Sequence, residues 1–255
     1  MANWSDPRTT SARVADPLAG PRTAAGIPVG AAAAARDAGL RSYMLSVYNY
    51  MASGVLLTGI VAMLFAGSEL GRSIMLGGGV LRWVIIFAPL LFIFAFGAAV
   101  NRASTGTLQI MFWAFAAIMG LSMSTIFLVY TQTSIAQAFF ATAAAFAGLS
   151  LYGYTTKRDL SGFGTFLIMG VVGLLVAMIL NIFLQSTALM FAISAIGVLI
   201  FAGLTAYDTQ KIKSMYFQLQ GSDFLGKSAI LGALSLYLDF INMFQFLLAF
   251  MGNRE

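Results

Sequence analysis

The sequence contains no cysteine and no histidine. Without cysteine the chain forms no disulfide, offers no thiolate nucleophile and holds no cysteine-ligated metal. Without histidine it lacks imidazole metal ligands, Ser-His catalysis and the side chain that ordinarily titrates near neutral pH. A response to pH near neutrality would therefore have to come from carboxyl groups in unusual surroundings.

Charged residues are scarce as well. They make up 9% of the 255 residues, whereas a soluble domain has about 25%. Hydrophobic residues reach 60%, and they form continuous runs instead of the alternating pattern of a membrane β-barrel. The predicted fold class is therefore an all-α integral membrane protein. Nothing in the composition suggests a nucleic-acid partner.

The chain divides into a polar tail and a membrane domain. Residues 1–39 are rich in Ala, Gly, Pro and Arg, and we expect them to form a flexible cytoplasmic tail that is not a cleaved signal peptide. Residues 40–252 are the predicted membrane domain. Its seven spans are expected at about 42–66, 83–101, 107–130, 135–154, 163–184, 188–208 and 228–251. The sixth helix is expected to continue through Lys213 to a break at Gln220-Gly221.

The basic residues are distributed unevenly over the connections. Eleven of the fourteen fall on the side of the tail: Arg8, Arg13, Arg22, Arg36, Arg41, Arg102, Lys157, Arg158, Lys211, Lys213 and Lys227. The positive-inside bias then predicts a cytoplasmic N-terminus and a C-terminus outside.

The last span, SAILGALSLYLDFINMFQFLLAFM, carries Asp239 near its middle. An aspartate at the centre of a membrane helix costs roughly 2.5–3.5 kcal/mol on insertion scales. Six small or polar residues recur at three- and four-residue spacing on one face of this helix: Ser228, Gly232, Ser235, Asp239, Asn242 and Gln245. This stripe predicts a central helix whose polar face meets other helices or a wet cavity.

A second carboxylate, Asp208, lies at the end of the sixth span in FAGLTAYDTQKIK. Two carboxylates that meet in a dry site would share a proton and titrate as a unit, although spacing alone does not bring them together. Asp208 has an alternative as the partner of Lys211 in an i,i+3 ion pair. The alternative for Asp239 is a purely structural role as a hydrogen-bonding group. Arg102 is either a cytoplasmic anchor or a long side chain that reaches a buried carboxylate.

The stretch AYDTQKIK, followed about thirty residues later by ALSLYLDFINMF, resembles the paired signature of the Bax inhibitor-1 family, also called the transmembrane Bax inhibitor motif family. The resemblance covers about residues 40–251 and is closest to a bacterial member. It implies six helices around a central seventh and a pH-controlled calcium leak of the cell inner membrane. It also implies that Asp208 and Asp239 form the proton-sensing pair and that Arg102 acts as its latch.

The leading hypothesis is thus a pH-sensitive calcium leak, with Ser235, Asn242 and Gln245 supporting the ion pathway and with no enzymatic activity, cofactor or bound metal. Its expected partners are the lipid bilayer, Ca²⁺ and protons. The main alternative is a regulatory protein that restrains another membrane protein, such as a membrane protease, without transport of its own. A proton-coupled transporter and an intramembrane aspartyl protease also use paired acidic groups. For the protease, the expected Gly-x-Gly-Asp is absent, because Asp239 follows Leu-Tyr-Leu.

Overall fold

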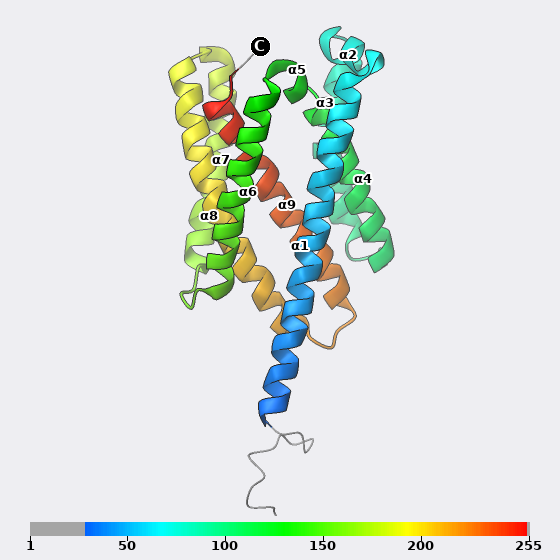
Figure 1. Ribbon diagram of the computed structural model, residues 1–255, viewed down its shortest axis with the longest axis vertical. Helices are drawn as coiled ribbons and strands as arrows, with labels where there is room; N and C mark the ends of the chain where they lie inside the picture. Colours follow the sequence, from blue (N-terminus) through cyan, green and yellow to red (C-terminus); the bar gives the residue numbers. More distant parts are fainter. Residues whose placement is uncertain (1–28, 254–255) are drawn as a thin grey trace, which may run out of the picture. The chain divides into compact units, whose positions relative to one another are not determined.

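The computed structural model of the protein describes residues 29–253 (Figure 1). Residues 43–253 belong to one compact unit, and residues 29–42 belong to another. The helices in the described part are α1 (Val29–Gly67), α2 (Glu69–Leu76), α3 (Val80–Ala99), α4 (Thr105–Met123), α5 (Ile126–Val129), α6 (Gln132–Thr155), α7 (Ser161–Leu184), α8 (Thr187–Leu219) and α9 (Phe224–Met251). The flexible tail predicted for residues 1–39 stays a prediction for residues 1–28, which lie outside the described part. Residues 29–39 are helical and form the start of α1.

Seven helical segments in the described part are long and apolar enough to cross a membrane. They are Ala33–Gly67, Val80–Ala99, Thr105–Val129, Gln132–Thr155, Ser161–Leu184, Thr187–Leu219 and Phe224–Met251. The all-α fold with seven spans predicted from the sequence is therefore confirmed. The sixth spanning helix, α8, continues past Lys213 and ends at Leu219, directly before the expected break.

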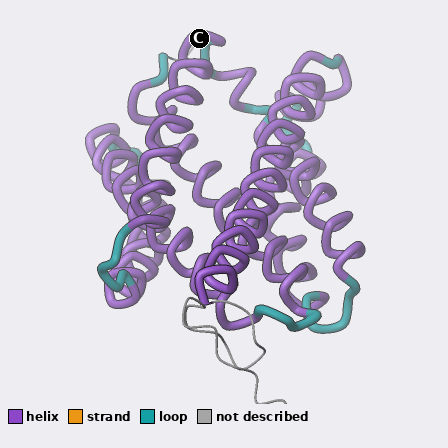
Figure 2. The backbone as a smooth tube through the Cα atoms, turned by 60° about the horizontal axis from the view of Figure 1, so that its bottom comes forward, coloured by secondary structure: helices purple, strands orange, loops and turns teal. Residues whose placement is uncertain are grey.

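Loops and turns separate the helices (Figure 2). Four of the helices begin after a Ser or Thr whose hydroxyl accepts a hydrogen bond from the backbone N–H three residues further on, and these capping residues are Ser68, Ser104, Thr131 and Ser186. Such a cap satisfies one of the backbone donors that a helix start leaves without a partner. The cap on Ser68 opens α2, an eight-residue helix that the sequence analysis did not anticipate.

The central element is α9. In the most apolar 18-residue stretch of α9, 50% of the residues are buried, compared with 11–33% in the corresponding stretches of the other spans. It packs against α8, α6 and α4, and it contacts α1 through a hydrogen bond between the hydroxyls of Tyr237 and Thr58. Figure 1 shows α9 passing between α6 and α1. The more peripheral helices α3 and α7 pack on α4 and α8. The central C-terminal helix expected from the polar stripe is thus present.

Three connections that the sequence assigned to the cytoplasmic side meet at one end of the unit formed by residues 43–253. The ammonium group of Lys227, at the start of α9, donates to the carbonyl of Val100 after α3 at 3.4 Å. The ammonium group of Lys213, near the end of α8, donates to the carbonyl of Tyr154 near the end of α6 at 2.7 Å. Basic residues of the connections between α3 and α4, α6 and α7, and α8 and α9 therefore cluster at the same end.

Candidate functional site

Asp239 lies on the buried central helix, and only 4% of its surface is exposed. One of its carboxylate oxygens, Oδ2, is buried without a hydrogen-bond partner among the described residues. Buried polar atoms nearly always have a partner, so a buried oxygen without one calls for an explanation. This oxygen is available to a proton, a water molecule or a cation.

Asp208 lies on α8 and lines the same cavity as Asp239. The two side chains come from neighbouring helices, because α8 and α9 pack along much of their length. Lys211 follows Asp208 by three residues on α8, and its ammonium group lies 5.9 Å from the centroid of the Tyr207 ring. The two aspartates therefore line one cavity, whereas their action as a proton-sharing pair and the alternative ion pair of Asp208 with Lys211 stay predictions.

The cavity has a volume of about 420 Å³. Its polar lining comes from four side chains, Asp208, Ser235, Asp239 and Asn242. The rest of the lining is apolar and comes mainly from α7 and α8: Ile168, Val171, Val172, Leu174, Leu175, Met178, Phe201, Leu204, Leu238 and Phe246. A few oxygen-bearing groups surrounded by apolar walls form an environment in which the charge state of a carboxyl group matters strongly.

A second cavity, also of about 420 Å³, adjoins the first. The two share Met178, Asn242 and Phe246 in their linings. Gln245, the last residue of the predicted stripe, lines the second cavity and lies nearer the C-terminal end of α9. The predicted stripe residues Ser235, Asn242 and Gln245 therefore follow a line of two adjoining cavities along α9.

The second cavity contains two polar residues that the sequence analysis missed, Asn181 on α7 and Ser194 on α8. Both interrupt long apolar spans, which is the sequence signal that could have pointed to them. Each also has a local role. The side-chain carbonyl of Asn181 accepts a hydrogen bond from the N–H of Ser186 at 3.0 Å, and the hydroxyl of Ser194 donates to the carbonyl of Met190 at 2.8 Å.

Arg102 lies apart from the two aspartates. Its side chain is exposed, it follows α3 in a turn closed by its own N–H to the carbonyl of Ala99 at 3.0 Å, and it does not line the cavity of Asp208 and Asp239. The structure thus brings the two acidic residues and the stripe together and leaves the predicted latch at the end of the bundle.

A seven-span helical bundle with a carboxylate pair beside its central helix defines a class of polytopic membrane proteins with an ionisable core. Comparison with known proteins narrows the class, because the family described as "Inhibitor of apoptosis-promoting Bax1" matches residues 40–255. The chain belongs to this Bax inhibitor family, as the resemblance of its two aspartate motifs predicted.

Several bacterial relatives are similar over most of their length. An uncharacterized protein of Rickettsia prowazekii is 48% identical over 220 residues, which is 86% of this chain and 92% of the relative. The inner membrane protein YbhL of Escherichia coli is 47% identical over 220 residues, which is 86% of this chain and 94% of YbhL. An uncharacterized protein of Caulobacter vibrioides is 47% identical over 239 residues, covering 90% and 96% of the two chains. These relatives support a multi-pass membrane protein and name no activity.

Proposed function

We propose that the protein is a pH-sensitive calcium leak in which protonation of the pair Asp208–Asp239 controls passage. The observation that carries this proposal is that both aspartates, from two different spanning helices, line one cavity beside the central helix. Two carboxyl groups in one mostly apolar cavity do not ionise independently. The negative charge of the cavity, and with it the attraction for a cation, then depends on pH.

Calcium fits the chemistry of this cavity better as an ion in transit than as a tightly held ligand. Ca²⁺ takes about six to eight oxygen ligands. The cavity offers two carboxylates, the hydroxyl of Ser235 and the amide of Asn242. An ion at this position therefore keeps part of its water, which suits binding that is strong enough for entry and weak enough for exit.

The remaining parts of the proposal concern orientation and the latch. The cluster of Lys213, Lys227 and the neighbouring basic connections at one end supports a cytoplasmic location for that end. The relative named as an inner membrane protein supports the same membrane for this chain. Arg102 is exposed near this end, so a role as latch requires the turn after α3 to move toward the cavity.

The test is calcium flux into liposomes that contain the purified protein, measured between about pH 5 and 8, the range in which physiological switches operate. Wild type is compared with Asp208→Asn and Asp239→Asn, which keep the shape of each side chain and remove its charge. Asp223→Asn, an exposed aspartate at the start of α9, is the matched control. We expect a pH-dependent flux in wild type and in the control, and loss of the pH dependence in both cavity variants.

Two results would contradict the proposal in different ways. A pH dependence that persists in both cavity variants removes the aspartate pair as the sensor. An absence of flux at every pH, with correctly folded protein, removes the leak itself and favours the regulatory role, in which the bundle acts on another membrane protein.

A further inference from the structure

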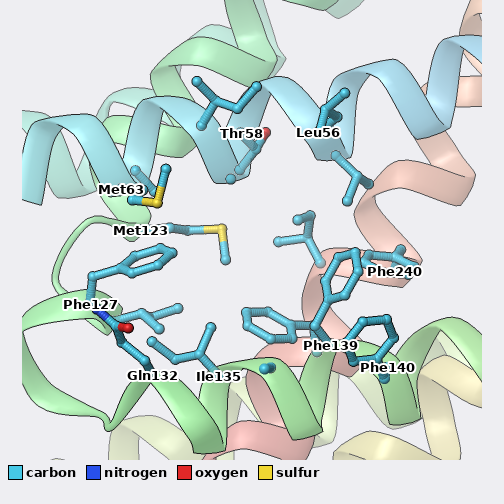
Figure 3. Close-up of a pocket in the computed structure, with 18 residues that line it drawn as sticks. Leu56, Thr58, Met63, Met123, Phe127, Gln132, Ile135, Phe139, Phe140 and Phe240 are labelled. Carbon is cyan, nitrogen blue, oxygen red and sulfur yellow. The ribbon is translucent and has the colours of Figure 1, made fainter.

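A groove of about 450 Å³ runs between α1 and α6, on the side of α9 away from the aspartates (Figure 3). Its volume lies within the roughly 300–1,000 Å³ of small-molecule sites and is about three times that of an apolar cavity of ~150 Å³ able to hold benzene. In Figure 3, Leu56, Thr58 and Met63 of α1 face Ile135 and Phe139 of α6 across the groove. A space of this size is large enough for a chain-like apolar ligand.

The groove is buried at its floor and open at its rim. The floor includes Ala62, Phe240 and Ile241, which are 2–5% exposed. The rim includes Leu56 and Phe140, which are 65% and 70% exposed. Because the rim belongs to helices that cross the membrane, it opens sideways into the hydrocarbon of the bilayer and not into water.

The length of the groove matches one leaflet. On α6 it extends from Gln132 to Phe140, and on α1 it extends from Val55 to Met63. Each of these stretches rises through eight residues, about 12 Å at 1.5 Å per residue. The hydrocarbon of one leaflet is about 15 Å thick, half of the ~30 Å core. The groove therefore begins at the end of a span and reaches close to the middle of the membrane.

The two polar residues of the lining lie at different depths in the membrane. Gln132 lies at the first residue of α6, beside Phe127 at one end of the groove (Figure 3), and it is exposed. The other polar residue, Thr58, lies deeper, and its hydroxyl is already engaged with the carbonyl of Ala116 at 2.8 Å and the hydroxyl of Tyr237 at 2.6 Å. An amphipathic occupant would thus meet an amide at the membrane surface and apolar walls below it.

We infer that this groove binds one acyl chain of a membrane phospholipid, held between α1 and α6 with its headgroup near Gln132. Three features favour a lipid tail over a protein helix: the rim faces hydrocarbon, the groove is about one leaflet long, and an amide lies at its outer end. A protein helix is ~10 Å in diameter and needs a wider groove. The inference does not depend on calcium flux.

The groove lies against the central helix on the side opposite the aspartate cavity. Its floor residues Phe240, Ile241 and Phe244 lie on the face of α9 opposite Asp239 and Asn242, because the two sets are about half a turn apart around the helix. An acyl chain in the groove therefore packs against the central helix from behind the aspartate cavity and fills space that the protein leaves open.

The inference is tested with a phospholipid that carries a photoreactive diazirine on its acyl chain. Wild-type protein is reconstituted with this lipid, transferred to detergent and washed to remove loosely bound lipid, and samples taken before, during and after washing are irradiated. Labelled residues are then mapped by mass spectrometry. We expect label to persist on residues 56–63 of α1 and 135–140 of α6 after washing, and to fall several-fold on the exposed face of α7 around Phe166 and Met169.

Two glycines provide a matched pair of variants. Gly59 lines the groove, and Gly173 lies on α7 away from it; a Cβ at either position meets nothing within 4 Å. Gly59→Leu fills the groove and should reduce the retained label several-fold, whereas Gly173→Leu should leave it unchanged. Ala136→Leu, across the groove on α6, gives a second filling variant if Gly59→Leu fails to fold.

Three outcomes would overturn the inference. One is a loss of label from α1 and α6 during washing at the same rate as from α7. Another is retained label that the filling variants do not reduce. The third is an absence of label in the groove before washing, which would mean that something other than lipid, such as another protein segment, occupies it.

Discussion

The hydroxyl of Tyr237 on α9 lies 2.6 Å from the hydroxyl of Thr58 on α1. Because Thr58 donates its own proton to the carbonyl of Ala116 on α4 at 2.8 Å, Tyr237 is the donor to Thr58. The Tyr237 ring is fully buried and meets Phe112 and Phe115 edge-on, with ring centroids 5.9 and 5.8 Å apart. One hydrogen-bonded chain therefore joins α1, α4 and α9.

This chain predicts an asymmetry between two substitutions. Thr58→Val leaves the buried Tyr237 hydroxyl without an acceptor and should reduce the free energy of unfolding by about 1–3 kcal/mol. Tyr237→Phe leaves Thr58 bonded to Ala116 and should cost only about 0.5–1.5 kcal/mol. Reversible unfolding in mixed micelles measures both. A larger loss in Tyr237→Phe would contradict the assigned direction of the hydrogen bond, and the double variant should be less destabilised than the sum of the two.

The closest packing of α6 on α8 depends on Gly153. A Cβ at this position would lie 2.2 Å from the backbone carbonyl oxygen of Ala206, so Gly153→Ala forces the two helices apart and should destabilise the protein by about 1–3 kcal/mol. Gly148 is the control on the same helix, because a Cβ there meets nothing within 4 Å. Gly148→Ala should be neutral or slightly stabilising. Equal unfolding curves for the two variants would show that this contact is looser than described.

The start of α7 should depend on the charge of Asp159. Its carboxylate accepts a hydrogen bond from the N–H of Ser161 at 2.9 Å. The side chain and then the backbone N–H of Ser161 lower the pKa of Asp159 below its ordinary value of 3.8. Because the pKa is lowered by folding, the contribution is present above pH 3.8 and is lost as the pH falls through the lowered value.

Hydrogen exchange of the Ser161 amide in wild type and Asp159→Asn measures this contribution. Asparagine resembles the protonated aspartic acid, so the variant should exchange faster at neutral pH and approach wild type as the pH falls below 3.8. A difference that stays constant across this range would mean that the charge does not stabilise the turn.

Much of the fold could be predicted from the sequence, because each span leaves a continuous apolar run and the polar stripe of α9 has helical spacing. The extension of α1 back to Val29 was not predicted. The run of alanines from Ala31 to Ala35 favours helix, but it lies beside Pro28 in a composition typical of a tail. The short helix α2 was also missed, since eight residues between two spans leave no membrane-length signal.

The candidate site was predictable in its members but not in its arrangement. Asp239 stood out because a carboxylate within a span is costly. That Asp208 lines the same cavity follows from how α8 and α9 pack, which their separation in sequence does not determine. The exposed position of Arg102 likewise depends on where the turn after α3 lies, and Asn181 and Ser194 were brought to the second cavity by packing alone.

Phe246 lies where the two cavities that follow the stripe on α9 meet. Its ring lies in both linings, stacks on Phe201 with 5.8 Å between ring centroids and sits so close to Gly197 that a Cβ there would be 2.6 Å from it. Phe246→Ala should therefore join the cavities and let water-soluble reagents pass from the second cavity to the first.

The absence of cysteine from the chain allows a direct measurement of this passage. Ser235→Cys places a thiol in the first cavity, and a membrane-impermeant thiol reagent is added to each side of the liposomes in turn. We expect slow labelling from the side of the C-terminus, and labelling at least several-fold faster when Phe246→Ala is added. Leu236→Cys, buried on another face of α9, is the control and should stay unreactive in both backgrounds. If Phe246→Ala does not change the rate at Ser235→Cys, the ring does not close the passage, and the route to the aspartates must be sought elsewhere.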